Sequence, residues 1–309
     1  MLRAFLLIVV GLAGDPEHGE LFQGWGSALA EAAETVGVSS DRLVYLADGT
    51  EDARVRGRAT REEIGSALSG FAEAAAPDDV VYVVLIGHGS YDGRTARFNL
   101  PGPDMTPADF NSLLGAIPAR NVVFVNTSSS SGPFVEGLSG PGRTIITATR
   151  NGAEQFTTLF GGYFVEAFAT EEADADKNQR LSMLEAFQYA RNETARAYEQ
   201  EGLLATEHAM LDDNGDKKGS PDPTSTGAEG RLAAALSLGS TASATPLPDD
   251  PALRALYLER RELERRVEAL RLLKGGLPPA RYAADLERLV INLALKTREI
   301  RTLEGDAAP

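Results

Sequence analysis

Two short apolar runs, each followed at once by polar residues, constrain the fold of this chain more than any other feature. The first is Val-Val-Tyr-Val-Val-Leu-Ile at 80–86, and it ends in Gly87-His88-Gly89. The second, Val-Val-Phe-Val at 122–125, ends in Asn126-Thr127 and four serines. Runs that are apolar throughout are typical of parallel strands buried on both faces. Because open α/β sheets form their sites just beyond the carboxyl ends of such strands, the sequence predicts a site where these two strands end.

Other segments alternate in the same way between strand and helix. Thr60 followed by Glu63 has the spacing of a capping box, and Thr106-Pro107 is typical of a helix start. The segment 231–238 fits either a late strand or a short helix. We therefore expect an α/β fold, a three-layer sandwich with a mostly parallel sheet, over residues 1–245. The expected strands are 6–10, 42–46, 80–86, 122–125 and 144–148, and the expected helices are 21–36, 60–75, 106–114, 160–169 and 183–201.

The apolar run at 4–14 has two readings. It resembles a short signal peptide, and it also has the β-branched residues and glycine-rich end of a buried first strand. It is too short to span a bilayer. We favour the strand, because the predicted sheet needs one there. The compartment stays open between the cytoplasm and export by a signal absent from this sequence.

Charge and cysteine content restrict the possible partners and chemistry. The 309 residues carry a formal net charge of −15, which argues against nucleic acid or an anionic membrane surface as a partner. The chain contains no cysteine. Disulfides, thiolate metal sites and a cysteine nucleophile are therefore excluded. The three histidines lack the spacing of a zinc site, and we expect no required cofactor.

The last sixty residues have a different character. Two highly charged segments carry apolar residues at helical spacing on either side of a Gly/Pro-rich turn at 275–279. This pattern predicts a second domain, 249–309, formed by an antiparallel helical hairpin that resembles a coiled coil. The hairpin either folds onto the first domain or self-associates with a second copy. The apolar positions are Leu256, Leu263, Val267 and Leu270 in the first helix and Tyr282, Leu286, Leu289, Leu293, Ile300 and Leu303 in the second.

The two strand ends resemble those of the caspase/legumain superfamily of cysteine peptidases, over roughly residues 4–215. In that family one strand ends in His-Gly and the next in the nucleophilic cysteine, so the resemblance implies a bacterial member that lacks this cysteine. It places His88 and the Gly89 amide, which would face the oxyanion, in the catalytic site. Alignment on Gly132 puts Ser129 at the cysteine position, whereas strand length alone would allow Ser128. The loop after strand 144–148 would supply binding residues, namely Thr149, Arg150 and Asn151.

Three functions follow from this resemblance. A serine hydroxyl is not measurably ionised at neutral pH, unlike a thiol, and the family's sites suit a thiolate. The leading expectation is therefore a pseudopeptidase that binds a peptide or protein segment in its cleft. The first alternative is an active peptidase or esterase with Ser129 as nucleophile and His88 as base, which Asp92 would orient. The second is a structural unit that acts through its hairpin.

Residues 174–185 have the spacing of an EF-hand calcium loop. Gln179 stands where that loop favours glycine, which would weaken binding. The alternative is a vestigial loop whose residues cap the helix that starts near Met183. A second acidic cluster at 212–219 lacks a distal Glu, and a solvated turn is favoured there over a metal site. The oxygen ligands expected for Ca²⁺ in the first loop are Asp174, Asp176, Asn178, the Arg180 carbonyl, Ser182 and Glu185.

Overall fold

The computed structural model describes residues 3–50, 52–239, 250–272 and 278–306. The chain forms two compact units, Met1–Ser240 and Thr241–Pro309. The predicted domain boundary at 245–249 lies outside the described residues. None of the described helices has the length and apolar character needed to cross a membrane.

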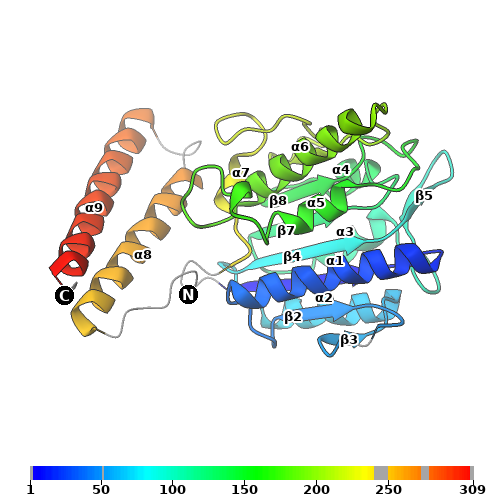
Figure 1. Ribbon diagram of the computed structural model, residues 1–309, viewed down its shortest axis with the longest axis horizontal. Coiled ribbons are helices and arrows are strands. Elements are labelled where there is room, and N and C mark those ends of the chain that lie inside the picture. Colours follow the sequence, from blue (N-terminus) through cyan, green and yellow to red (C-terminus); the bar gives the residue numbers. More distant parts are fainter. Residues whose placement is uncertain (1–2, 51, 240–249, 273–277, 307–309) are drawn as a thin grey trace. The chain divides into compact units, whose positions relative to one another are not determined.

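The first unit is organised around a seven-stranded sheet with the order β3-β2-β1-β4-β7-β8-β9 (Figure 1). All pairs are parallel except β8–β9, which is antiparallel. The fold class expected from the sequence is thus confirmed. The strands are β1 (Ala4–Val10), β2 (Leu43–Leu46), β3 (Val55–Gly57), β4 (Val80–Ile86), β7 (Asn121–Asn126), β8 (Arg143–Thr147) and β9 (Met210–Asp212).

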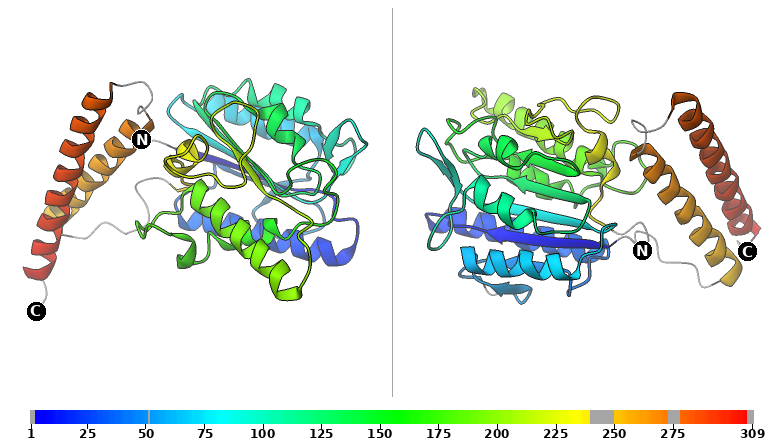
Figure 2. Two further views of the ribbon diagram at one scale, coloured as in Figure 1. Left: turned by 90° about the horizontal axis from the view of Figure 1, so that it is seen from above. Right: turned by 180° about the vertical axis from the view of Figure 1, so that it is seen from behind.

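Helices cover both faces of this sheet, which makes three layers (Figure 2). One face packs against α1, α5, α6 and α7, through residues such as Phe22, Phe164 and Phe187. The other packs against α2, α3 and α4. Every residue of β1 and β4 is buried, which is why these strands are apolar throughout. The helices are α1 (Pro16–Thr35), α2 (Arg61–Ala74), α3 (Pro107–Leu114), α4 (Pro133–Leu138), α5 (Phe160–Glu166), α6 (Met183–Glu201) and α7 (Arg231–Ala235).

The local signals in the sequence locate most of these elements. Thr60 and Thr106 are N-caps whose hydroxyls accept backbone N–H groups of the first turn, as predicted. The apolar run near the N-terminus is the strand β1, and the segment after Gly230 is the short helix α7. Helix α1 begins earlier than predicted, because Asp15 caps it and Pro16 occupies its first turn.

Several short elements carry no sequence signal. They are β3, β9, α4, the 3₁₀ turn Glu171–Ala173 and the hairpin of β5 (Gly89–Tyr91) with β6 (Ala96–Phe98). Three-residue strands show no usable alternation, so only their pairing partners define them.

The second unit contains two helices, α8 (Pro251–Leu272) and α9 (Pro279–Asp306), which lie side by side and run in opposite directions (Figures 1 and 2). Val267, Leu270 and Leu289 are buried between them, with Leu263, Tyr282 and Leu286 packed around. Lys296 of α9 forms a 2.7 Å ion pair with Glu259 of α8. Residues 273–277, with most of the predicted Gly/Pro turn, lie outside the described part of the chain.

Candidate functional site

The two strand ends singled out by the sequence lie next to each other, because β4 and β7 are neighbours in parallel register. The Gly89 N–H donates to Ser129 Oγ at 3.2 Å, and the Ser129 hydroxyl donates to the Gly89 carbonyl oxygen at 3.0 Å. A Cβ at Gly89 would lie 2.2 Å from the Ser129 carbonyl oxygen and 2.7 Å from Ser128 Oγ. Only glycine therefore fits this approach of the two chain segments.

The two serines that compete for the nucleophile position have different surroundings. Ser128 is fully buried, and its hydroxyl donates to Asn126 Oδ1 at 2.7 Å. Ser129 is 3% exposed and is the one whose hydroxyl reaches Gly89. The geometry thus brings Ser129, rather than Ser128, into hydrogen-bond contact with the backbone after His88.

His88 lies half-buried just beyond β4. Its ring centroid is 4.9 Å from that of His18 and 5.1 Å from that of Phe22. Burial lowers the pKa of His88, the neighbouring His18 lowers it further, and a backbone hydrogen bond with Ala13 partly offsets both. Among the described residues, no hydrogen bond joins His88 to Ser128 or Ser129. The predicted base therefore makes no hydrogen bond to the predicted nucleophile.

Asp92 does not orient His88, contrary to the hydrolase alternative. Its carboxylate accepts the Thr95 backbone N–H at 2.8 Å and pairs with Arg97 at 2.7 Å. These contacts lower the pKa of Asp92 to about 2 and hold it in the turn between β5 and β6. A spacing of four residues does not bring Asp92 to His88, because the turn directs this side chain to its own loop.

The residue that does face His88 is His18, in the first turns of α1. Its Nδ1 lies 2.7 Å from Asp15 Oδ2, and Asp15 also caps the helix. The sequence predicts His18 near the edge of the site but in a loop, whereas the structure has it in helix α1, which starts at Pro16. The Asp15-Pro16 pair is the signal that locates it.

The remaining serines connect the site to the loop after β8. Ser130, with φ of 55°, donates its N–H to the Glu154 carbonyl at 2.8 Å. Ser131 Oγ lies 3.1 Å from Thr149 Oγ1. Thr149 is fully buried, so it positions the loop and does not line a cleft as predicted. Arg150 and Asn151 are exposed on this loop, and Arg150 lies 3.7 Å from Glu154.

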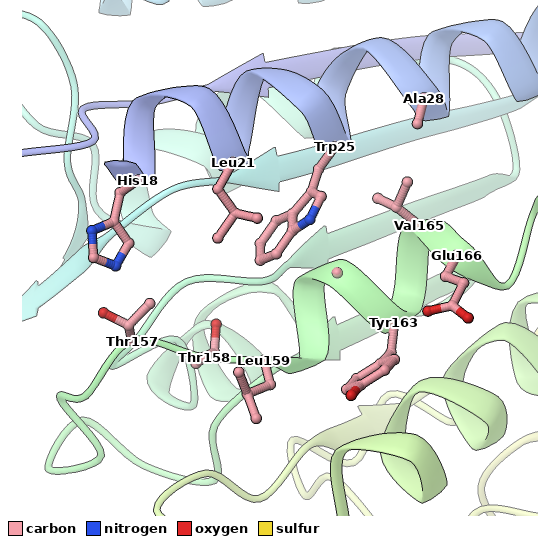
Figure 3. Close-up of a pocket in the computed structure, with 11 residues that line it drawn as sticks. His18, Leu21, Trp25, Ala28, Thr157, Thr158, Leu159, Tyr163, Val165 and Glu166 are labelled. Carbon is pink, nitrogen blue, oxygen red and sulfur yellow. The ribbon is translucent and has the colours of Figure 1, made fainter. Parts of the chain in front are cut away.

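A hollow of about 530 Å³ opens beside His18, between α1 and the start of α5 (Figure 3). Leu21 and Trp25 of α1 face Leu159 and Tyr163 across it. Leu21 is 43% exposed and Leu159 is 41% exposed, so apolar surface is accessible here. Apolar walls with few polar groups suit the binding of a ligand. The full lining is His18, Leu21, Trp25, Ala28, Thr157, Thr158, Leu159, Gly162, Tyr163, Val165 and Glu166.

The EF-hand-like loop brings three carboxylates together. Oxygens of Asp174, Asp176 and Glu185 all lie within 4.8 Å of one another. Gln179 has φ of 65°, the left-handed conformation that this position of a calcium loop requires. Ser182 and Glu185 also form the capping box of α6, as the alternative interpretation expects. Burial and the charge of Glu185 raise the pKa of Asp176.

Comparison with known proteins places these strand ends in a family. Residues 63–212, which include His88, Gly89 and Ser129, match the family model of the Peptidase C13 family. Among solved structures, the chain is similar to the initiator caspase Dronc of Drosophila at 11% identity and a TM-score of 0.41, over 70% of this chain and 81% of that chain. No curated protein matches. Residues 63–212, which carry both strand ends, are thus similar to the Peptidase C13 family.

Proposed function

We propose that this protein is a pseudopeptidase, which binds a peptide or protein segment at the β4–β7 strand ends without cleaving it. The observation that carries the proposal is the pair of hydrogen bonds between Ser129 and Gly89. The hydroxyl proton is donated to a backbone carbonyl, not to a base. The Gly89 N–H, the amide that would stabilise an oxyanion, is already bound by the same Ser129 oxygen.

The surroundings of His88 favour the same conclusion. A serine nucleophile needs a base in hydrogen-bond contact, and a third group commonly orients that base. No such contact joins His88 to Ser129 in the described structure, and Asp92 is bound to Arg97. The ring of His88 packs against His18 and Phe22 instead. These ring contacts fit a His88 side chain that forms part of a binding surface better than one that acts as a catalytic base.

The exposed side chains around the site indicate where a bound segment would make contact. Arg150 and Asn151 extend from the loop after β8, and the apolar hollow beside His18 offers room for a large side chain. Glu154 partly offsets the charge of Arg150. We therefore propose an extended segment with an apolar residue next to the His18–His88 pair as the ligand.

Replacing Ser129 by cysteine tests this function. Wild type, Ser129→Cys and the matched control Ser128→Cys are incubated with a diverse peptide library and with a fluorophosphonate probe. We expect the wild type neither to cleave peptides nor to react with the probe. Ser129→Cys should cleave peptides, and this activity should be lost in Ser129→Cys/His88→Ala. Ser128→Cys should not cleave peptides. Wild-type turnover or fluorophosphonate labelling that disappears in His88→Ala would establish a serine hydrolase instead.

We also propose that the 174–185 loop binds Ca²⁺. The support is the convergence of Asp174, Asp176 and Glu185, together with the left-handed backbone at Gln179. Calcium favours carboxylate and carbonyl oxygens held by a flexible loop of this kind. The ion would fix the start of α6 and has no part in the chemistry of the strand ends.

A further inference from the structure

The second acidic loop, 212–219, is exposed at Asn214 and at residues 216–218, as a solvated turn would be, but its first two residues are buried. It begins at the end of β9, and two backbone hydrogen bonds between Leu211 and Ser220, of 3.0 and 2.8 Å, close it. Asp212 is 1% exposed, and Asp213 and Glu229 are each 8% exposed. Three buried carboxylates at one place require a compensating interaction.

Each of these carboxylates accepts a backbone hydrogen bond: Glu229 Oε2 from the Asp213 N–H at 2.8 Å and Asp212 Oδ1 from the Gly215 N–H at 3.1 Å. Asp213 accepts the backbone N–H groups of Gly230 and Ala233, each at 2.8 Å, and so caps α7. Asp212 Oδ2, in contrast, is buried and accepts no hydrogen bond. A carboxylate oxygen left in this state costs free energy unless a cation neutralises it.

Asp212, whose Oδ2 has no hydrogen-bond partner, belongs to a group of carboxylates that lie close together. Carboxylate oxygens of Asp212, Asp216 and Glu229 lie within 4.8 Å of one another. No lysine, arginine or histidine in the described part of the chain forms an ion pair with any of the three. Burial, reinforced by the charges of Asp212 and Asp213, raises the pKa of Glu229 to about 7. The distal carboxylate that the local sequence lacks is therefore supplied from further along the chain.

The backbone of this loop repeats that of the 174–185 loop. Counted from Asp174, the fourth and sixth residues are Lys177 and Gln179, with φ of 53° and 65°. Counted from Asp212, they are Gly215 and Lys217, with φ of 81° and 69°. Both loops therefore have left-handed residues at the fourth and sixth positions, and the sixth is where an EF-hand loop makes its sharp turn.

We propose that Asp212, Asp216 and Glu229 bind a Ca²⁺ ion at the end of β9. All the proposed ligands are oxygens, which favours hard cations over zinc or copper, and several carboxylates, of which Asp212 and Glu229 are buried, suit calcium better than the more strongly hydrated magnesium. The ion would tie the edge strand β9 to the segment that carries Glu229 and leads into α7. The site is thus a brace for one edge of the sheet and is separate from the strand ends of β4 and β7.

The test uses the full chain after removal of metal with EDTA, in the background Asp176→Asn, which disables the other loop. Calorimetric titration with CaCl₂ and thermal unfolding with and without Ca²⁺ are measured. We expect one bound ion per chain and a calcium-dependent rise in Tm, both lost on adding Asp216→Asn. Asp222→Asn, whose carboxylate is 79% exposed in the same segment, is the matched control and should retain both. MgCl₂ at equal concentration should produce a smaller shift.

Glu229→Gln gives an independent readout. Without calcium it should unfold at a higher temperature than its Asp176→Asn parent, because one uncompensated buried charge is removed. With calcium it should show a reduced affinity. The proposal is overturned if the Asp176→Asn parent binds no calcium, or if its binding and Tm rise survive both Asp216→Asn and Glu229→Gln. Failure here leaves the pseudopeptidase proposal untouched, since the two sites share no residue.

Discussion

The His88 side chain lies between His18 and Phe22, and this packing has a measurable consequence. Burial and the adjacent His18 lower its pKa, while Asp15 and the Ala13 backbone oppose the shift. The folded protein therefore prefers the neutral ring, whereas the unfolded chain is protonated with the ordinary pKa of about 6.5. The stability that the neutral His88 ring contributes is fully present above the unfolded pKa of about 6.5. It is lost as the pH falls towards the lowered pKa of the folded state.

Replacement of His88 by glutamine should remove this dependence. We expect the fall in Tm between pH 7.5 and pH 5.5 to be smaller in His88→Gln than in wild type. Leu12→Ala, at an exposed and uncharged position, should retain the wild-type fall. Equal falls in all three proteins would show that His88 titrates in the folded state as it does in the unfolded chain.

The candidate site was predictable in part at this scale. His88, Gly89 and Ser129 were found because their positions depend only on where two strands end. His18 was expected near the edge of the site, but its ring contact with His88 and the burial of Thr149 were not predicted, since both arise from packing between segments far apart in the chain. Local spacing misled at Asp92, whose turn brings it to Arg97.

At the scale of elements, the 174–185 loop carries a residue in a conformation that its side chain disfavours. Gln179 has φ of 65°, which costs about 1 kcal/mol for a residue with a Cβ. Gln179→Gly should remove this strain, partly offset by about 0.4–1 kcal/mol of added unfolded-state entropy. We expect unchanged or slightly raised stability without metal and a higher calcium affinity, because the glycine reaches the ligand conformation freely.

Denaturant unfolding and calcium titration of the full chain measure both effects. Lys218→Gly, in the other acidic loop and outside the left-handed region, is the matched control and should lower stability. A loss of stability in Gln179→Gly as large as that in Lys218→Gly would contradict the strain argument.

Strands and helices were predictable where the residues of a segment show a clear apolar run or an apolar face at helical spacing. The strands β1, β4 and β7 contain continuous apolar runs, and the long helices have caps and periodic faces. Strand β9 and the hairpin of β5 with β6 are three residues long and exist through partners distant in sequence. The buried carboxylates after β9 were missed for the same reason, because Glu229 joins them from another segment.

At the scale of the whole molecule, the second unit shows apolar surface on two sides. One side of α9 packs against α8 through residues such as Leu286 and Leu289. Ile291 and Leu295, one turn apart, are 51% and 43% exposed on another side, and Leu258 of α8 is 48% exposed. Exposed apolar residues at helical spacing are typical of an association surface. This surface supports the expectation that the hairpin associates with a second copy.

The mass of the full chain in solution tests this association. A monomer has a mass of 32.9 kDa, and size-exclusion chromatography with light scattering at rising concentration should report a larger species for wild type. Ile291→Lys/Leu295→Lys should return the monomer, because burying two ammonium groups costs more than the apolar contact contributes. Ala283→Lys/Asn292→Lys adds the same charge at exposed positions of α9 off this face, and it should associate like wild type. A wild type that stays monomeric, or equal masses for both double variants, would leave the hairpin without this role.

The net charge of −15 opposes association between copies, so any association through apolar side chains should strengthen as salt screens that repulsion.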